Sequence, residues 1–210
     1  TSVRQALQRQ TQALVNRYAR EYSSNHIHYL AAIVADVETG EVLAYAGNAT
    51  YPADERRGNQ VDIITSPRST GSILKPFLYA GMLHDGLLLP SMLVSDVPLN
   101  INGFSPHNYN KTFYGAVPAH VAIERSLNVP LVRMLSQYNT GRFMSLLKSW
   151  GMTTLRFSEE HYGASLILGG AEGTLWDLSG MYASMSRVLK HYRTYNGRYN
   201  PADIHPLTPF

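Results

Sequence analysis

The chain has 210 residues, 44% of them hydrophobic, which is enough to bury a core and excludes a disordered protein. Its 18 lysines and arginines exceed its 15 acidic residues by only three and form no basic run, which argues against a nucleic-acid partner. Because the chain contains no cysteine, disulfides, thiolate metal sites and cysteine nucleophiles are all excluded.

Apolar periodicity in the first 50 residues predicts a helix followed by a β-hairpin. Residues 27–36 and 41–46 are rich in Ile, Val, Leu, Ala and Tyr, which predicts two strands. Gly40 lies between them and can adopt a positive φ, so we expect a tight turn and a helix packed on the resulting sheet. The helix is expected over 4–22, with apolar positions at Val3, Leu7, Leu14 and Tyr18.

From residue 50 onward the pattern predicts loops alternating with helices. The segment 50–60 carries Pro52 and four charged residues, which is typical of a surface loop. Apolar spacing predicts a helix that begins at Ser72 and ends at Gly86. Residues 87–117 contain several prolines and glycines and are expected to be irregular. Further helices are expected over 118–126, 130–137 and 141–150, and from Thr174 as the cap to about Lys190.

Ser72-Ile73-Leu74-Lys75 forms a Ser-x-x-Lys tetrad, which is the first candidate for chemistry. A serine hydroxyl needs a base to become nucleophilic, and a lysine can serve where burial lowers its pKa. Ser72 follows Gly71 and begins the predicted helix, where a free backbone N–H favours a developing oxyanion. Lys75 is expected one turn later on the same face. The alternative interpretation is a helix-capping serine beside a solvated lysine.

The same tetrad occurs at Ser145 to Lys148, but that serine lies inside a predicted helix, where its hydroxyl can bond back to a carbonyl.

A second candidate is Ser126-Leu127-Asn128. Ser126 could relay protons near Lys75, and Asn128 could hold a substrate amide. Because Ser and Asn are also favoured helix caps, a capping role is the alternative for this pair.

Two kinds of site find no support in the sequence, a metal centre and a membrane-spanning helix. His26 and His28 share one face of a predicted strand without a third ligand, so we expect no metal site and no cofactor. The longest fully apolar stretch, 29–35, is far shorter than the ~18 residues that a membrane span requires. Any membrane anchor is therefore expected outside this sequence.

Five segments, in order along the chain, resemble the motifs of one family. The run Ser69-Thr70-Gly71-Ser72-Ile73-Leu74-Lys75, continued to residue 80, resembles a nucleophile motif, and 126–130 resembles a second motif. Segments 106–109 and 168–174 resemble the stretches before and after that second motif, and 35–46 resembles the first two strands. The family is the class A penicillin-binding proteins. The Ser-Thr-Gly before the serine is most similar to the penicillin-binding protein 1C group.

The resemblance implies the α+β fold of penicillin-binding proteins and serine β-lactamases, with an antiparallel sheet packed against helices and a helical lobe. It further implies a single transpeptidase domain over 1–210. The activity implied is that of a peptidoglycan D,D-transpeptidase, which β-lactams inhibit by acylating the same serine. In that role Ser72 attacks the D-Ala-D-Ala carbonyl of a stem peptide, Lys75 is the base, and Ser126 and Asn128 relay protons and position substrate.

Partners and location follow from the same resemblance. The family carries an upstream glycosyltransferase domain and a membrane anchor, and it works at the periplasmic face of the bacterial inner membrane. The substrate is a peptidoglycan stem peptide, and the acyl-enzyme passes to an amine of a neighbouring stem. A carboxypeptidase or β-lactamase that uses water as acceptor is an alternative. A module that senses β-lactams or binds peptidoglycan without turnover is another.

The chain departs from the family in its third motif, Lys-Thr-Gly, which does not occur among the 210 residues. Lys111-Thr112-Phe113 precedes Ser126 and lacks the glycine, so it does not replace the motif. In the family this motif lies on a later sheet strand that lines the cleft. We therefore expect the domain 1–210 to be incomplete at its C-terminus and to need the missing strands as a partner.

Overall fold

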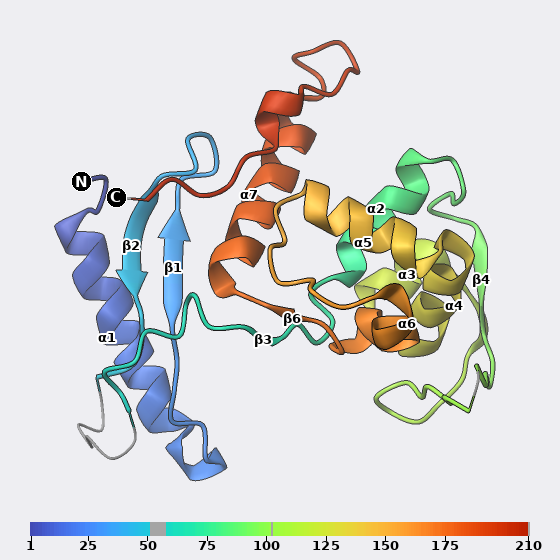
Figure 1. The fold of residues 1–210 in the computed structure, drawn as a ribbon, viewed down its shortest axis with the longest axis horizontal. Coiled ribbons are helices and arrows are strands. Elements are labelled where there is room, and N and C mark those ends of the chain that lie inside the picture. Colours follow the sequence, from blue (N-terminus) through green and yellow to red (C-terminus); the bar gives the residue numbers. More distant parts are fainter. Residues whose placement is uncertain (51–57, 102, 210) are drawn as a thin grey trace. The chain divides into compact units, whose positions relative to one another are not determined.

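The computed structural model describes residues 1–50, 58–101 and 103–209, so most of the loop expected at 50–60 lies outside the described residues. The chain divides into two compact units. Unit 1 combines both ends of the chain, drawn in blue and red in Figure 1, whereas unit 2 is built from the middle. Unit 1 comprises Thr1–Arg68, Trp150–Thr153 and Gly173–Phe210, and unit 2 comprises Ser69–Ser149 and Thr154–Glu172.

Unit 1 contains an antiparallel hairpin and two long helices. β1 (Ala32–Ala35) pairs with β2 (Val42–Ala46), and Gly40 in the turn adopts a φ of +72°, as predicted. The strand expected over 27–36 begins later, at Ala32, which faces Ala46, the last residue of β2. The helices of this unit are α1 (Gln5–Glu21) and α7 (Leu175–His191), with the 3₁₀ turns η1 (Ser23–Asn25) and η4 (Pro201–Asp203).

α1 packs on the hairpin with a different face from the predicted one. Its buried residues are Thr11, Val15 and Ala19, of which the last two join alanines of the hairpin region in one apolar cluster. Leu14 and Tyr18 are instead 47% and 38% exposed. The alanine-lined surface of the hairpin admits a closely approaching helix, so small side chains fill the contact and the large ones are left outside it.

α7 is fixed at both ends by hydrogen bonds. The Thr174 hydroxyl accepts a hydrogen bond from the Asp177 backbone N–H at 2.9 Å, which confirms the predicted cap. Near the other end Arg187 is only 2% exposed and donates to the carbonyl oxygens of Val37 and Asp203. The buried guanidinium therefore ties α7 to the hairpin turn and to η4.

Unit 2 is mainly helical, and its core lies among α2, α4 and α5. Gly81 permits a close approach there, since a Cβ atom at this position would lie 2.7 Å from Leu146. The helices are α2 (Lys75–His84), α3 (Ala119–Glu124), α4 (Asn128–Tyr138), α5 (Thr140–Ser149) and α6 (Glu159–Tyr162), followed by the 3₁₀ segment η3 (Gly163–Leu168). The three helices predicted between 118 and 150 are thus confirmed.

The segment 87–117 is more regular than the sequence predicts. β4 (Leu93–Asp96) and β5 (Gly115–Pro118) form an antiparallel pair in which Val94 faces Val117. Each strand has four residues and a long connection separates them, so neither produces a clear alternating pattern. Two further short strands are β3 (Arg68–Ser69) and β6 (Glu172–Gly173). In each of them one residue belongs to unit 1 and the other to unit 2.

Candidate active site

Ser72 lies in a turn that immediately precedes α2, not in the helix itself. The turn closes with a hydrogen bond from the Lys75 N–H to the Ser72 carbonyl at 3.2 Å. A helix beginning at Ser72 would need a donor at Pro76, which has no N–H, so the predicted start at Ser72 is wrong by three residues. Ser72 is exposed, and among the described residues neither its hydroxyl nor its N–H makes a hydrogen bond.

The residues before Ser72 are held by the loop around Gly169. Thr70 is 2% exposed and donates from its N–H and its hydroxyl to the Ala171 carbonyl, at 3.1 and 3.0 Å. The Ser69 hydroxyl donates to the Gly169 carbonyl at 2.8 Å. Gly71 then adopts a φ of +51°, which turns the chain toward α2. The position of the nucleophile candidate is therefore set by long-range contacts in unit 2.

Lys75 is the first residue of α2 and is only 1% exposed. Its Nζ donates to Asn128 Oδ1 at 2.7 Å, to the Ser126 carbonyl at 2.8 Å and to Ser126 Oγ at 3.2 Å. Three acceptors match the three protons of an ammonium group. Burial nevertheless disfavours the charge and lowers the pKa of Lys75 to about 8. A small change in pH therefore converts this ammonium into a base.

Ser126 and Asn128 approach Lys75 from the turn between α3 and α4. Ser126 is exposed and has a φ of +51°, a left-handed conformation that is uncommon for a residue other than glycine. That conformation directs both its carbonyl and its hydroxyl at Lys75. Asn128 begins α4, and its Nδ2 donates to the His107 carbonyl at 2.9 Å. The backbone strain at Ser126 thus accompanies a cluster of polar groups that can exchange protons.

The second Ser-x-x-Lys tetrad has a different environment. Ser145 lies within α5, and its hydroxyl donates to the Gly141 carbonyl at 2.9 Å, as expected of a helix-interior serine. Lys148 is exposed in the last turn of the same helix. This tetrad therefore lacks the features of the first one, since its serine hydroxyl is bonded to its own helix and its lysine is not buried.

A family model described as the penicillin-binding protein transpeptidase domain matches residues 30–174. The chain belongs to this family. Penicillin-binding protein 1C of Escherichia coli is 36% identical over 174 residues, which are 83% of this chain and 22% of that protein. Penicillin-binding protein 1B of Vibrio cholerae is 26% identical over 166 residues, 76% of this chain and 20% of that protein. The chain thus spans about a fifth of the length of these relatives.

Two solved structures resemble this penicillin-binding protein chain in fold. PonA1 from Mycobacterium tuberculosis, in complex with penicillin V, aligns with a TM-score of 0.73 at 20% identity over 90% of this chain and 50% of that chain. A peptidoglycan glycosyltransferase from Burkholderia ambifaria aligns with a TM-score of 0.73 at 21% identity over 88% of this chain and 60% of that chain. The predicted fold class, α+β with helices on a sheet and a helical lobe, is confirmed.

Two buried residues behind the penicillin-binding motifs were not predicted from the sequence. Asn108 is 3% exposed, and its Oδ1 accepts a hydrogen bond from the Asn128 N–H at 2.9 Å. Asp96 is fully buried and accepts hydrogen bonds from Asn108 Nδ2. The segment 106–109 resembles the family, but the resemblance gave it no role, and nothing in the sequence around Asp96 distinguishes that residue.

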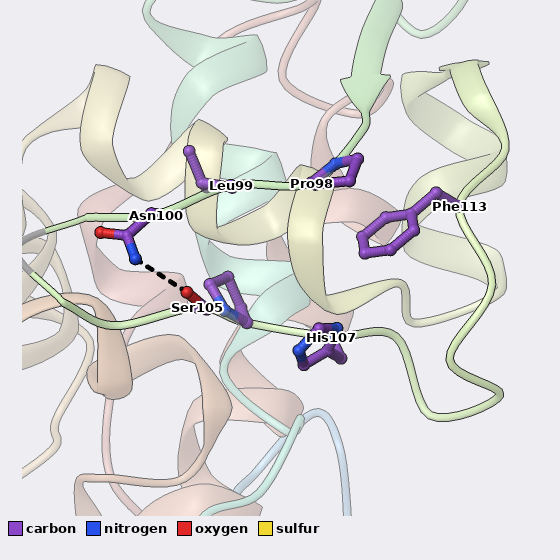
Figure 2. A pocket seen from close by; sticks show the side chains of 7 residues that line it. Pro98, Leu99, Asn100, Ser105, His107 and Phe113 are labelled. Atoms are coloured by element: carbon purple, nitrogen blue, oxygen red, sulfur yellow. Dashed lines mark hydrogen bonds between the residues drawn. The ribbon is translucent and has the colours of Figure 1, made fainter.

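A pocket of about 410 Å³ lies beside His107, the residue whose carbonyl holds Asn128. Figure 2 shows Asn100 pointing toward Ser105, to which it donates a hydrogen bond at 2.9 Å, with Phe113 and His107 at the other side. The remaining lining residues are Pro98, Leu99 and Pro106. This pocket is mainly apolar and adjoins the penicillin-binding motifs through the backbone of residue 107.

Metal ligands do not gather in the part of the chain that the structure describes, where no three His, Cys, Asp or Glu side chains come together. His26 and His28 lie before β1 and not on it, and His26 has a φ of +61°. The expectation that they share a strand face is therefore wrong. Among residues 1–50, 58–101 and 103–209, none of the helices has both the length and the apolar character to cross a bilayer.

Proposed function

We propose that this chain is a peptidoglycan D,D-transpeptidase domain that works through an acyl intermediate on Ser72. The observation that carries the proposal is the buried Lys75 ammonium, which Ser126 and Asn128 hold one turn after the exposed Ser72. The lowered pKa of Lys75 supplies a base near neutral pH. Membership of the penicillin-binding family supports the same reaction.

In the acylation step, Ser72 Oγ forms a bond to the carbonyl carbon of the penultimate D-Ala of a stem peptide. Its proton passes to the neutral Lys75 Nζ. The free N–H of Ser72 stabilises the negative charge that develops on the carbonyl oxygen. When the bond to the terminal D-Ala breaks, the leaving amine receives a proton from the Lys75 and Ser126 pair. The products are free D-Ala and an ester on Ser72.

In the transfer step, an amine of a neighbouring stem peptide attacks the ester, and the same groups accept its proton. β-Lactams acylate Ser72 as mimics of D-Ala-D-Ala, in keeping with the penicillin V bound to the related PonA1 structure. The full-length protein carries an upstream glycosyltransferase domain and acts at the periplasmic face of the inner membrane. The name of the related Burkholderia ambifaria structure, a peptidoglycan glycosyltransferase, supports that domain context.

The nucleophile is tested with a fluorescent penicillin on the full-length protein. The label is expected at Ser72 and is expected to disappear in Ser72→Ala. Ser145→Ala is the matched control, since it alters the other Ser-x-x-Lys tetrad, and it should label normally. Labelling that survives Ser72→Ala would remove Ser72 from the mechanism.

The acceptor is tested separately with a stem pentapeptide and an added amine, with products identified by mass spectrometry. A new amide to the added amine, with release of D-Ala, supports transpeptidation. Release of D-Ala without amide formation would identify a D,D-carboxypeptidase. A lasting ester on Ser72 with neither product would identify a non-catalytic sensor.

A further inference from the structure

α4 begins without a capping side chain of its own. Its N-cap residue is Leu127, which offers no acceptor to the free N–H groups of the first turn. Asn108 supplies the acceptor from elsewhere in unit 2, because its Oδ1 lies 2.9 Å from the Asn128 N and 3.3 Å from the Val129 N. The start of α4, and with it Asn128, is thereby held at a fixed place.

Asn108 is itself fixed by a buried carboxylate. Its Nδ2 donates to Asp96 Oδ1 and Oδ2 at 2.9 and 3.0 Å and to the Thr112 carbonyl at 2.9 Å. A carboxylate accepts hydrogen bonds and donates none, so it forces the amide nitrogen of Asn108 toward itself and the amide oxygen toward α4. Asp96 also accepts from the Tyr114 N–H at 3.0 Å, and no described cation pairs with it.

These bonds form one line from Asp96 to Lys75. Asp96 orients Asn108, Asn108 holds the backbone of Asn128, and Asn128 Oδ1 accepts from Lys75 Nζ at 2.7 Å. We propose that Asp96 and Asn108 are positioning residues that place Asn128 against Lys75. The proposal rests on the function assigned to Lys75 above, and neither residue touches the reacting atoms.

The surroundings of Lys75 allow this series of hydrogen bonds to be tested through the pKa of Lys75. In the described residues the polar groups bonded to the Lys75 ammonium all belong to Ser126 and Asn128. On the helices packed against α2, Arg142 pairs with Asp85, and Glu124 acts with burial to raise the pKa of Tyr79. A change in the pKa of Lys75 therefore reports on Ser126 and Asn128.

The test exchanges the carboxylate of Asp96 and the amide of Asn108 in the full-length protein, first at one position and then at both. Asn108→Asp places two buried carboxylates against each other, so we expect it to displace Asn128 and slow acylation by a β-lactam by about 10²-fold. The double variant Asp96→Asn with Asn108→Asp restores one carboxylate and one amide. The amide at position 96 then donates to the carboxylate at position 108, which still accepts from α4 but loses the bond to the Thr112 carbonyl, so the rescue is partial and about tenfold of the rate should return. The loss should fall on the acylation rate constant and leave the non-covalent affinity nearly unchanged.

A second readout does not depend on catalysis. After ¹³C-lysine labelling of the full-length protein, the Cε resonance of Lys75 is assigned by its loss in Lys75→Arg and is then titrated by NMR. A displaced Asn128 no longer stabilises the ammonium, whereas the added carboxylate at position 108 favours it, so the Lys75 midpoint should shift in Asn108→Asp and return toward the wild-type value in the double variant. Asp96→Asn keeps the shape of the side chain and one acceptor oxygen, so its Lys75 midpoint and acylation rate should lie between those of the wild type and Asn108→Asp. This variant replaces Asn108→Asp in the test if Asn108→Asp does not fold.

Each outcome decides one of the two proposals. A folded Asn108→Asp protein with an unchanged Lys75 midpoint and acylation rate would overturn the positioning role and leave the proposed function standing. A double variant that is folded but no better than Asn108→Asp would overturn it as well. A Lys75 midpoint that shifts and returns as expected, in a protein that Ser72 never acylates, would support the positioning role and overturn the proposed function.

Discussion

If Lys75 is the base, as proposed, the acylation rate depends on pH in a predictable direction. Burial lowers the pKa of Lys75 to about 8, so the residue is mostly an ammonium below that pH and mostly a base above it. We expect the acylation rate of Ser72 to rise about tenfold per pH unit up to a midpoint near 8 and then level. Lys75→Arg should abolish this rise and slow acylation by about 10²-fold, because arginine keeps its proton. Lys148→Arg is the control, and an unchanged rate in Lys75→Arg would exclude Lys75 as the base.

Gly169 controls the position of the proposed nucleophile, Ser72, through close packing against Gly71. A Cβ atom at Gly169 would lie 2.8 Å from the Gly71 backbone N, and φ is +102°. Gly169→Ala should therefore push the turn that carries Ser72 and slow its acylation by about 10²-fold. Gly151→Ala is a matched control, since its φ is +107° and nothing lies within 4 Å. Both variants should lower the melting temperature, and equal acylation rates in the two would contradict the role of Gly169.

How far single residues could be predicted depends on sequence separation. Ser72 and Lys75 could be singled out because the proposed nucleophile and base lie in one tetrad with a glycine before it. The burial of Lys75 and the left-handed Ser126 could not, because both arise only when α2 meets the turn before α4. Asp96 and Asn108 are 12 residues apart, and Asn108 acts on a helix that starts 20 residues later. The hydrogen bonds of Asp96 and Asn108 form only because the fold buries these two side chains against each other, and no local sequence pattern indicates that burial.

At the scale of elements, periodicity predicted the long helices and the hairpin well. Periodicity failed where contacts with another element of the fold determine which residues are buried or paired. The alanines opposite α1 select Val15 and Ala19 for burial in place of Leu14 and Tyr18. The β4–β5 pair depends on a contact between two four-residue segments that a long connection separates. Tertiary context therefore overrides the local pattern at both places.

α7 is joined to the hairpin turn by a pH-sensitive contact. His191 Nδ1 lies 2.9 Å from Asp203 Oδ1, and Nε2 lies 2.9 Å from Glu38 Oε2. The hydrogen bond to Asp203, followed by the contacts to Glu38, raises the pKa of His191. Because the folded pKa is raised, this stabilisation is fully present below the unfolded value of about 6.5 and is lost as pH rises through the folded pKa.

The corresponding prediction compares thermal melts of the full-length wild type and its His191→Gln variant between about pH 5.5 and 8.5. The advantage of the wild type should be largest at the acidic end of this range and should shrink as the pH rises. His26→Gln, which alters a histidine outside this contact, should melt in parallel with the wild type at every pH. A constant difference between wild type and His191→Gln would show that His191 acts by packing and not by charge.

At the scale of the whole molecule, unit 1 presents apolar surface that its own described residues do not cover. β1 pairs with β2 alone among the described strands, and all four of its residues are only partly buried. On α1, Leu14 and Tyr18 are 47% and 38% exposed, and Tyr22, which follows the helix, is 41% exposed. A two-stranded hairpin is marginal in water, and an unpaired edge favours association with another strand. We infer that further strands, including one with a Lys-Thr-Gly motif, cover this edge in the working enzyme.

We therefore expect residues 1–210 alone to self-associate, to melt without strong cooperativity and to acylate slowly. Loss of one oxyanion donor alone reduces such reactions by about 10²–10³-fold. Adding a segment that carries the third motif, in cis or as a separate fragment, should restore a cooperative melt and Ser72 labelling. Leu14→Glu combined with Tyr18→Lys should reduce the self-association of the short chain, measured by light scattering. Leu89→Lys is the control, because Leu89 is 61% exposed in unit 2, and this substitution should leave the self-association unchanged. A monomeric, cooperatively melting and fully labelled 1–210 would show that unit 1 needs no added strands, because the half-buried β1 would then be stable with β2 and the helices alone.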